Sequence, residues 1–369
     1  MSDLQPNSVA VVFGTRPEII KLARIIELLG PAARVIHTGQ HYDRTLSQIF
    51  IEGLGIDDPD LRLRVGGVSR GRQIGSALNA LDGALTEQRP RVVVVQGDTN
   101  TALAGGLAAN ALGIPLCHVE AGLRSFDRTM PEEHNRVLVD HLSDLLMAPT
   151  AVSEKNLVNE GVNSDWIRVT GNTVVEAVHR LLPDEERRKR VLKEYEVETS
   201  EFVLTTFHRP ENVDDPNTFE AILQSLHSLE FPVILPLHPR SRKEIEIHGL
   251  GRLLEPIRVV DPIGYEEFLA LSAESAFLVS DSGGVQEEAS VYKRPVIVVR
   301  RSTERPEVLG TFARLVHPGD ELVSTAAEWT RELAGLHAWL ASVESPYGEG
   351  NASLQIVEEL ETLLIGAGR

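Results

Sequence analysis

The chain has 369 residues, of which 42% are hydrophobic and 24% charged, as in a globular protein long enough for two domains. Its formal net charge of -18 argues against nucleic acid as the main partner, because phosphate backbones select basic surfaces. Cys117 is the only cysteine, which excludes a disulfide framework and a thiolate zinc site. No apolar run approaches the roughly 20 residues that span a bilayer, and the polar N-terminus lacks a signal region. We therefore expect a cytoplasmic protein that does not bind membranes.

Short β-branched runs alternate with helical patterns along most of the chain. Several runs are apolar at nearly every position, which is typical of parallel strands buried on both faces. The predicted strands are Val9–Phe13, Arg34–His37, Arg91–Val95, Leu116–Val119, Phe202–Thr206, Pro232–Leu237, Ile257–Val260, Phe277–Ser280 and Pro295–Val299. Helical stretches such as Glu18–Leu29 and Thr101–Leu112 lie between them. This alternation predicts an α/β fold built from right-handed βαβ units in doubly wound sheets.

The regular pattern weakens near Gly171, and a second series of strands begins at Phe202. We therefore predict two domains, residues 1–170 and residues 171–352, with the charged run Asp184–Glu198 forming a solvated helix. Ser353–Ile365 has apolar residues at helical spacing and predicts a C-terminal helix. Two open parallel sheets side by side make a cleft, and ligands of such sheets bind at the carboxyl ends of the strands.

Polar residues follow the first predicted strand in residues 14–18 (GTRPE). Gly14 permits a tight turn, and the start of the following helix offers N–H groups to an anion. Arg16 and Lys21 would add positive charge. The alternative interpretation is an ordinary βα turn with a surface arginine. The pattern is not the G-x-G-x-x-G fingerprint, so nothing here indicates NAD.

The densest charged segment is residues 118–136 (HVEAGLRSFDRTMPEEHNR), which combines carboxylates for proton transfer with arginines for an anion. Asp98 and Glu120 each follow a predicted strand, and the two side chains would converge with Glu132 on one ligand. Two alternatives stay open at this point. Asp98 has the position of a helix N-cap, while Glu132 has capping-box spacing, with Arg136 as its partner at i+4. The buried stripe predicted for the following helix consists of Leu138, Leu142, Leu145 and Leu146.

The second domain carries two polar segments after strands, residues 206–212 (TFHRPEN) and residues 280–288 (SDSGGVQEE). Ser-Gly-Gly at a helix start lets the backbone approach a diphosphate, and Glu288 about one turn later would reach a ribose diol. A Gly-Gly pair before a helix is more often a packing feature, but Arg305 after the next strand favours a nucleotide diphosphate. The histidines lie on separate segments without H-x-x-x-H spacing, so we predict no metal site.

Taken together, GTRPEIIK, TGQHYD, QGDTNT, HVEAGLR, PEEHNR, TFHRPENV, SDSGGVQEEAS and TERPE resemble the non-hydrolysing UDP-N-acetylglucosamine 2-epimerases. The motifs run from Gly14 to Glu307 in the order of that family. The resemblance implies two Rossmann-like domains in a GT-B-type arrangement with an interdomain active-site cleft. It also implies that the C-terminal helix, residues 353–369, packs back on the first domain. We expect a homodimer, the commonest oligomer of soluble proteins.

By resemblance, the reaction interconverts UDP-GlcNAc and UDP-ManNAc without a cofactor. UDP is eliminated across C1–C2 to give 2-acetamidoglucal and is added again after protonation of the other face. The matching positions imply that the catalytic residues are Asp98, Glu120, Glu132 and His208. The residues implied to bind the nucleotide sugar are Arg16, Lys21, Arg136, Phe268, Ser282, Gly283, Gly284, Glu288 and Arg305.

Two departures from the family pattern affect these expectations. Tyr42-Asp43 stands where many bacterial members have an arginine linked to a regulatory second UDP-GlcNAc site, which puts allosteric activation in doubt. Residues 308–312 are bulkier than usual, which predicts Phe312 in the cleft wall and leaves a modified sugar possible. The alternative functions are a hydrolysing 2-epimerase that releases ManNAc and UDP, and a non-catalytic nucleotide-sugar sensor. The acid/base residues disfavour the sensor, because binding alone needs no such groups.

Overall fold

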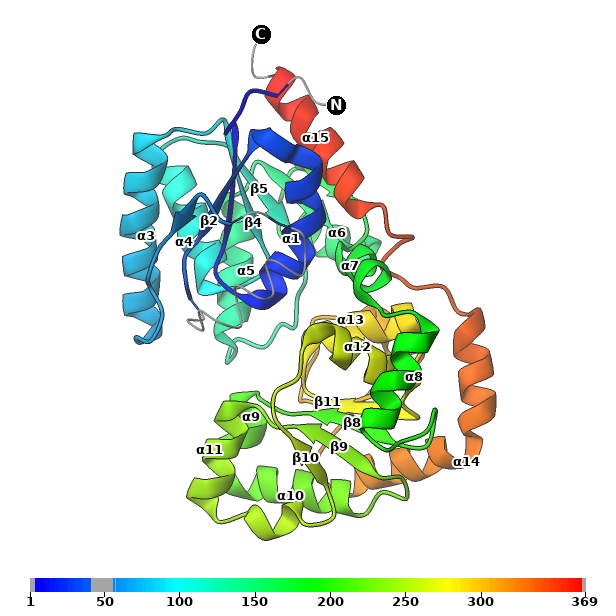
Figure 1. The fold of residues 1–369 in the computed structure, drawn as a ribbon. Helices are drawn as coiled ribbons and strands as arrows, with labels where there is room; N and C mark the ends of the chain where they lie inside the picture. The colour runs from blue at the N-terminus through cyan, green and yellow to red at the C-terminus, as the bar shows by residue number, and fades with distance from the viewer. Residues whose placement is uncertain (1–3, 41–55, 57, 367–369) are drawn as a thin grey trace. The chain divides into compact units, whose positions relative to one another are not determined.

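The structure, a computed structural model, describes residues 4–40, 56 and 58–366. The chain divides into two compact units. Unit 1 contains Met1–Ala177 and Tyr347–Arg369, and unit 2 contains Val178–Pro346. In the described ranges each unit has one parallel sheet with helices beside it (Figure 1). The predicted fold class, α/β with two Rossmann-like sheets, is confirmed.

The sheet of unit 1 has seven strands within the described ranges, in the order β3-β2-β1-β4-β5-β6-β7. They are β1 Val9–Phe13, β2 Ala33–His37, β3 Leu61–Arg62, β4 Val92–Gln96, β5 Leu116–Val119, β6 Leu145–Ala148 and β7 Ile167–Val169. Among the described residues, the helices of this unit are α1 Arg16–Leu29, α3 Arg70–Glu87, α4 Asn100–Ala111, α5 Pro131–Leu142, α6 Ala151–Asn159, α7 Val174–Leu181 (which crosses into unit 2) and α15 Ala352–Gly366. Because β1, β4 and β5 are neighbours, the turns that follow them meet at one edge of the sheet.

Two apolar cores cover the two faces of this sheet, which explains why its central strands are apolar at most positions. Val11 of β1 faces a core shared with α1 and α15, whereas Val12 faces a core shared with α3 and α4. Alternate side chains of a strand point to opposite faces, so a strand buried on both sides is mostly apolar on both.

The sheet of unit 2 has six strands among the described residues, in the order β10-β9-β8-β11-β12-β13. They are β8 Val203–Thr206, β9 Val233–Pro236, β10 Arg258–Val260, β11 Phe277–Ser280, β12 Val296–Val299 and β13 Ala313–Val316. Its helices are α8 Glu185–Glu194, α9 Pro210–Val213, α10 Pro216–His227, α11 Pro239–His248, α12 Tyr265–Glu274, α13 Gly283–Tyr292 and α14 Asp320–Ser342. None of the helices in the described ranges of either unit is long and apolar enough to cross a bilayer.

The prediction that one helix after residue 136 buries Leu138, Leu142, Leu145 and Leu146 on a single face was wrong. Helix α5 ends at Leu142, Leu145 and Leu146 belong to strand β6, and Leu138 is 51% exposed. The Ser143 hydroxyl donates to the carbonyl of Val139 and helps to close the helix. A four-residue apolar run fits either a strand or a helix. Leu145 and Leu146 lie three and four residues after Leu142, which is the spacing of one helix face. Strands β3, β7 and β13 were also missed; each has at most four residues, and one of these is an arginine.

Helix α15 returns to unit 1 and lies along α1 (Figure 1). Its residues Ile356 and Leu360 are fully buried in the same core as Leu22 of α1. The Arg91 side chain donates to the carbonyl of Leu364 near the end of α15. The last helix therefore contributes to the core that supports strand β1.

We predict that Leu360→Ala lowers the free energy of unfolding of unit 1 by roughly 2–5 kcal/mol, because it leaves a cavity in this core. Leu354→Ala is the matched control, since Leu354 lies on the same helix but is 50% exposed. Hydrogen exchange of the amides of β1 reports the stability of unit 1 specifically. If Leu360→Ala lowered the stability of unit 1 no more than Leu354→Ala does, α15 would not stabilise this core.

Candidate active site

The turn after β1 is built around the buried carboxylate of Glu18. Its Oε2 accepts from the backbone N–H groups of Gly14 (3.0 Å) and Thr15 (2.7 Å) and from the Thr15 hydroxyl (2.7 Å). Its Oε1 accepts from the hydroxyl of Thr99 (2.7 Å), which follows β4. Glu18 therefore joins two neighbouring turns and binds the N–H groups of Gly14 and Thr15 just before α1.

Close packing and burial set the properties of this turn. A Cβ at Gly14 would lie 2.2 Å from the Thr101 hydroxyl and 2.3 Å from the Thr38 hydroxyl, so only glycine fits. Burial raises the pKa of Glu18 to about 7, against the lowering effect of its hydrogen-bond donors. The Glu18 carboxyl group thus changes from neutral to negatively charged close to neutral pH.

Glu120 follows β5 in an unusual backbone conformation. Its φ is +71°, in the left-handed region that non-glycine residues rarely adopt. The carboxylate is buried and forms an ion pair with Lys21 of α1. Asn172 donates a second hydrogen bond to the same oxygen, Oε2, at 3.1 Å. Strained backbone of this kind is concentrated at functional sites, where surrounding contacts hold it in place.

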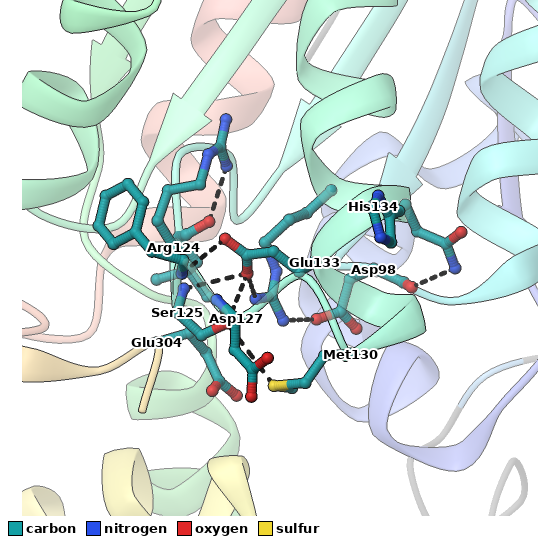
Figure 2. A network of polar contacts seen from close by, with 12 residues as sticks. Asp98, Arg124, Ser125, Asp127, Met130, Glu133, His134 and Glu304 are labelled. Atoms are coloured by element: carbon teal, nitrogen blue, oxygen red, sulfur yellow. Dashed lines mark hydrogen bonds and ion pairs between the residues drawn. The ribbon is translucent and has the colours of Figure 1, made fainter. Parts of the chain in front are cut away.

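Asp98 follows β4 and pairs with Arg136 of α5. The helix-cap interpretation of Asp98 was wrong, because Thr99 caps α4 by accepting from the Ala102 N–H (3.0 Å). Arg136 is buried, and its other terminal nitrogen pairs with Glu133. Figure 2 shows Asp98 and Glu133 in one network of polar contacts.

Glu133 also fixes the loop before α5. Its carboxylate accepts from the N–H (3.0 Å) and hydroxyl (2.8 Å) of Ser125 and from the Phe126 N–H (2.8 Å), as Figure 2 shows for Ser125. Glu132, in contrast, is exposed at the start of the helix. The predicted capping box is absent, because α5 begins after Met130 without a side-chain cap. Arg136 pairs with Glu133 at i+3 rather than with Glu132 at i+4.

A fully buried histidine supports the turns that carry Asp98 and Glu120. The Nδ1 atom of His118 contacts Asp140 at 2.6 Å, and its Nε2 atom contacts the carbonyl of Gly97 at 2.8 Å. Asp140 also pairs with Arg124 at 2.7 Å. Burial opposes ionisation of Asp140, but His118 and Arg124 outweigh it and hold the pKa of that carboxyl below its ordinary value.

In unit 2 the turn after β8 is arranged around Asp281, which follows β11. Its carboxylate accepts from the backbone N–H groups of His208 (3.1 Å) and Arg209 (2.9 Å) and contacts the His208 imidazole at 3.1 Å. Burial opposes ionisation of Asp281, but the hydrogen bonds from His208 outweigh it and lower the pKa of the carboxyl. The His208 side chain is 42% exposed, so it is both oriented and accessible.

The start of α13 combines a close backbone approach with buried charge. A Cβ at Gly283 would lie 2.6 Å from Nη1 of Arg305, so the guanidinium packs directly on the helix start. Arg305 is buried and pairs with Glu287 at 2.8 Å and with Glu304. One turn into the helix, Glu288 accepts from the Tyr265 hydroxyl at 2.8 Å.

The predicted site residues are divided between the two units. Unit 1 holds Asp98, Glu120 and Arg136 in the contacts described above, and Lys21 belongs to them through its pairing with Glu120. Arg16 is partly exposed at the start of α1, and its side chain makes no ion pair or hydrogen bond within the described residues. The residues in unit 2 are His208, Phe268, Ser282, Gly283, Gly284, Glu288 and Arg305.

Two expectations about the surroundings of the site have different outcomes. Phe312 is fully buried, with the Lys293 ammonium 5.1 Å from its ring centre, so its predicted place in a cleft wall was wrong. Tyr42 and Asp43 lie outside the described residues. The cleft between the domains stays a prediction.

Four buried residues that organise the site were missed from the sequence: Glu18, Glu133, Asn172 and Asp281. Glu18 had a local signal, since Thr15 and Glu18 have capping-box spacing and the side chain reaches back to the Thr15 N–H. Asn172 and Asp281 act through contacts more than 50 residues away in the chain, which no local pattern indicates.

The arrangement suits proton transfer beside an anionic ligand. Two carboxylates, Asp98 and Glu120, follow neighbouring strands, and each lies against a cation that balances its charge. Within the described ranges, no group of three or more His, Cys, Asp or Glu side chains is placed to hold a metal ion. No dinucleotide fingerprint follows β1, where Gly14 and Thr15 form the turn into α1.

Comparison with known proteins gives consistent results. The sequence model of one family, described as UDP-N-acetylglucosamine 2-epimerase, matches residues 30–361. The UDP-N-acetylglucosamine 2-epimerase of Methanocaldococcus jannaschii is 40% identical over 364 residues, covering 95% of this chain and 98% of the relative. The UDP-2,3-diacetamido-2,3-dideoxy-D-glucuronate 2-epimerase of Pseudomonas aeruginosa is 37% identical, covering 96% of this chain and 99% of the relative. A crystal structure of the M. jannaschii UDP-GlcNAc 2-epimerase in complex with UDP-GlcNAc and UDP is similar, with a TM-score of 0.85 and 39% identity over 96% of this chain and 99% of that one.

The pKa of Glu18 predicts a pH-dependent stability. Because its pKa in the folded state is about 7, above the ordinary 4.5, the folded protein binds this proton more tightly than the unfolded chain. The stability from Glu18 is therefore fully present below pH 4.5 and falls by roughly 3 kcal/mol as the pH rises to about 7.

Glu18→Gln removes this titration while its amide oxygen still accepts from the N–H groups of Gly14 and Thr15. We expect the variant to gain stability relative to the wild type between pH 4.5 and 7.5 in urea unfolding experiments. Glu27→Gln is the control, because Glu27 is exposed on the same helix. Parallel stability curves for Glu18→Gln and the wild type would contradict the assignment.

Proposed function

Because the chain belongs to the UDP-N-acetylglucosamine 2-epimerase family, we propose that it interconverts UDP-GlcNAc and UDP-ManNAc without hydrolysis. The observation that supports this most strongly is the pair of carboxylates, Asp98 and Glu120, that follow neighbouring strands. Each is held by a cation from a different helix, Arg136 of α5 and Lys21 of α1. A similar protein from M. jannaschii has been crystallised with UDP-GlcNAc and UDP.

The proposed reaction has two steps that balance without an oxidant. In the first, a carboxylate removes the proton at C2, the electron pair of that bond forms C1=C2, and UDP leaves C1 with the C1–O electron pair. In the second, a proton is returned to the other face of C2, and the UDP oxygen forms the bond to C1 again. Acid/base groups on opposite faces of the sugar are needed for this inversion, and each contributes typically 10²–10⁴-fold to the rate.

The residues of unit 2 are proposed to hold the nucleotide. The helix start at Ser282, Gly283 and Gly284 would receive the diphosphate, and Glu288 with Tyr265 beside it would bind the ribose diol. His208, oriented by Asp281, would stabilise the departing diphosphate. Electrostatic stabilisation of the charge that develops on a leaving group often accounts for more of the rate enhancement than any other single effect.

A modified sugar is the second candidate substrate. The P. aeruginosa relative, 37% identical over 367 residues, is a 2-epimerase of UDP-2,3-diacetamido-2,3-dideoxy-D-glucuronate. The same bonds break and form at C1 and C2 of that sugar, so the carboxylates of unit 1 suit either compound. The ratio of kcat/KM for the two nucleotide sugars decides between them. The homodimer and the cytoplasmic location stay predictions.

We predict that Asp98→Asn and Glu120→Gln each lower kcat by at least about 100-fold and leave UDP binding nearly unchanged. The amides keep the size of each side chain but do not accept a proton. Epimerisation would be followed by proton NMR, and UDP binding by calorimetry. Glu87→Gln serves as the control, because Glu87 is an exposed carboxylate at the end of α3. Near-normal turnover in Asp98→Asn and Glu120→Gln would exclude both residues from the proton-transfer steps.

A further inference from the structure

Asn172 lies between strand β7 and helix α7 and is buried, with only 3% of its surface exposed. Its N–H donates to the carbonyl of Tyr347 at 2.9 Å, which fixes the backbone at this point. Gly171 before it has a φ of +81°, and a Cβ there would lie 2.8 Å from the same carbonyl. The backbone just before Asn172 therefore has a conformation that only glycine at residue 171 allows.

Both ends of the Asn172 amide have defined partners. The Oδ1 atom accepts from the Val174 N–H at 3.0 Å, at the start of α7. Since a carbonyl oxygen must face that donor, the NH₂ group must face Glu120, where Nδ2 lies 3.1 Å from Oε2. The orientation of the amide is thus set by the hydrogen bonds, and it presents a donor to Glu120.

The two oxygens of Glu120 have different surroundings. Lys21 and Asn172 both contact Oε2. Oε1 lies 4.0 Å from the position that a Cβ would take at Gly97, so it is turned toward the turn that carries Asp98. The last torsion of a glutamate side chain is broad and roughly twofold, so a carboxylate without such contacts would present either oxygen.

We propose that Asn172 is a positioning residue that, together with Lys21, holds Oε2 of Glu120 so that Oε1 exchanges the proton at C2 of the sugar. The inference rests on the proposed epimerase function. In the forward direction the C2–H bond breaks, the O–H bond forms at Oε1, and the electron pair forms C1=C2 as UDP leaves. Fixing the carboxylate before the substrate binds avoids reorganisation during the reaction, and an error of about 1 Å in such a geometry costs on the order of 100-fold in rate.

Asn172→Asp tests this proposal most sharply. The aspartate keeps the size of the side chain and an acceptor for the Val174 N–H, but it places a carboxylate oxygen against Oε2 of Glu120. We expect kcat to fall by roughly 10- to 100-fold, while KM and the dissociation constant of UDP stay within about twofold. Asn172→Ser also keeps an acceptor but does not reach Glu120, so we expect a smaller fall in kcat for this variant.

The control is Asn163→Asp. Asn163 also accepts a backbone N–H, that of Asp165 at 3.0 Å, but it is exposed. This variant is expected to keep the wild-type kcat. Melting temperatures of all three variants show whether a loss of rate reflects a loss of folded protein.

The outcomes separate this proposal from the proposed function. If the wild type does not epimerise UDP-GlcNAc, the proposed function is wrong. The positioning of Glu120 is then tested by crystal structures of the wild type and Asn172→Asp, which show where Oε1 lies relative to Gly97. An unmoved Glu120 carboxylate in Asn172→Asp would overturn the proposal. A wild-type kcat in this variant, or a loss that appears only in KM, would overturn it as well. A fall in kcat with unchanged KM and a rotated Glu120 would support it.

Discussion

The buried ion pair between Lys21 and Glu120 is the contact that links the elements of the site in unit 1. An unpaired charge inside a protein costs several kcal/mol, so the two side chains stabilise each other's burial and neither is removed without a large loss. The pair joins α1, which begins at the turn after β1, to the residue that follows β5. It also compensates for the left-handed backbone of Glu120, a conformation that costs on the order of 1–3 kcal/mol.

Around this pair, buried polar groups fix each turn that carries a reactive side chain. Glu18 joins the turns after β1 and β4, His118 holds the carbonyl of Gly97, and Glu133 holds the arginine that contacts Asp98. In unit 2 Asp281 has the same role for His208. The residues that contact substrate in the proposed reaction are thus supported by others that are more deeply buried, which is a general requirement for a preorganised site.

Much of the fold could be predicted from the sequence, because apolar runs of four or five residues, such as Val9–Phe13, are distinctive in a parallel sheet. The prediction failed where the spacing of an apolar run to a preceding leucine also fitted a helix, as at Leu145 and Leu146, which are strand rather than helix. Asp98, Glu120 and His208 could be singled out as candidate site residues because polar residues directly after buried strands stand out. Phe312 was misplaced, because bulk in a sequence does not reveal which way a side chain points.

The supporting residues were harder to predict for a physical reason. Asn172 and Glu120 are 52 positions apart, and their contact exists only after β5, β6 and β7 have paired. Between the adjacent Glu132 and Glu133, no local pattern indicates which is buried, since that depends on the angle at which α5 begins. The resemblance to the 2-epimerases is confirmed by the family match and by relatives that cover nearly the whole chain.

The most direct test of the proposed chemistry is proton NMR of the purified protein with UDP-GlcNAc in heavy water, without added cofactor. Elimination and re-addition of UDP predict that UDP-ManNAc appears and that both nucleotide sugars gain deuterium at C2. Release of free ManNAc and UDP would contradict the non-hydrolysing reaction. Epimerisation that keeps the C2 proton would contradict the roles given to Asp98 and Glu120.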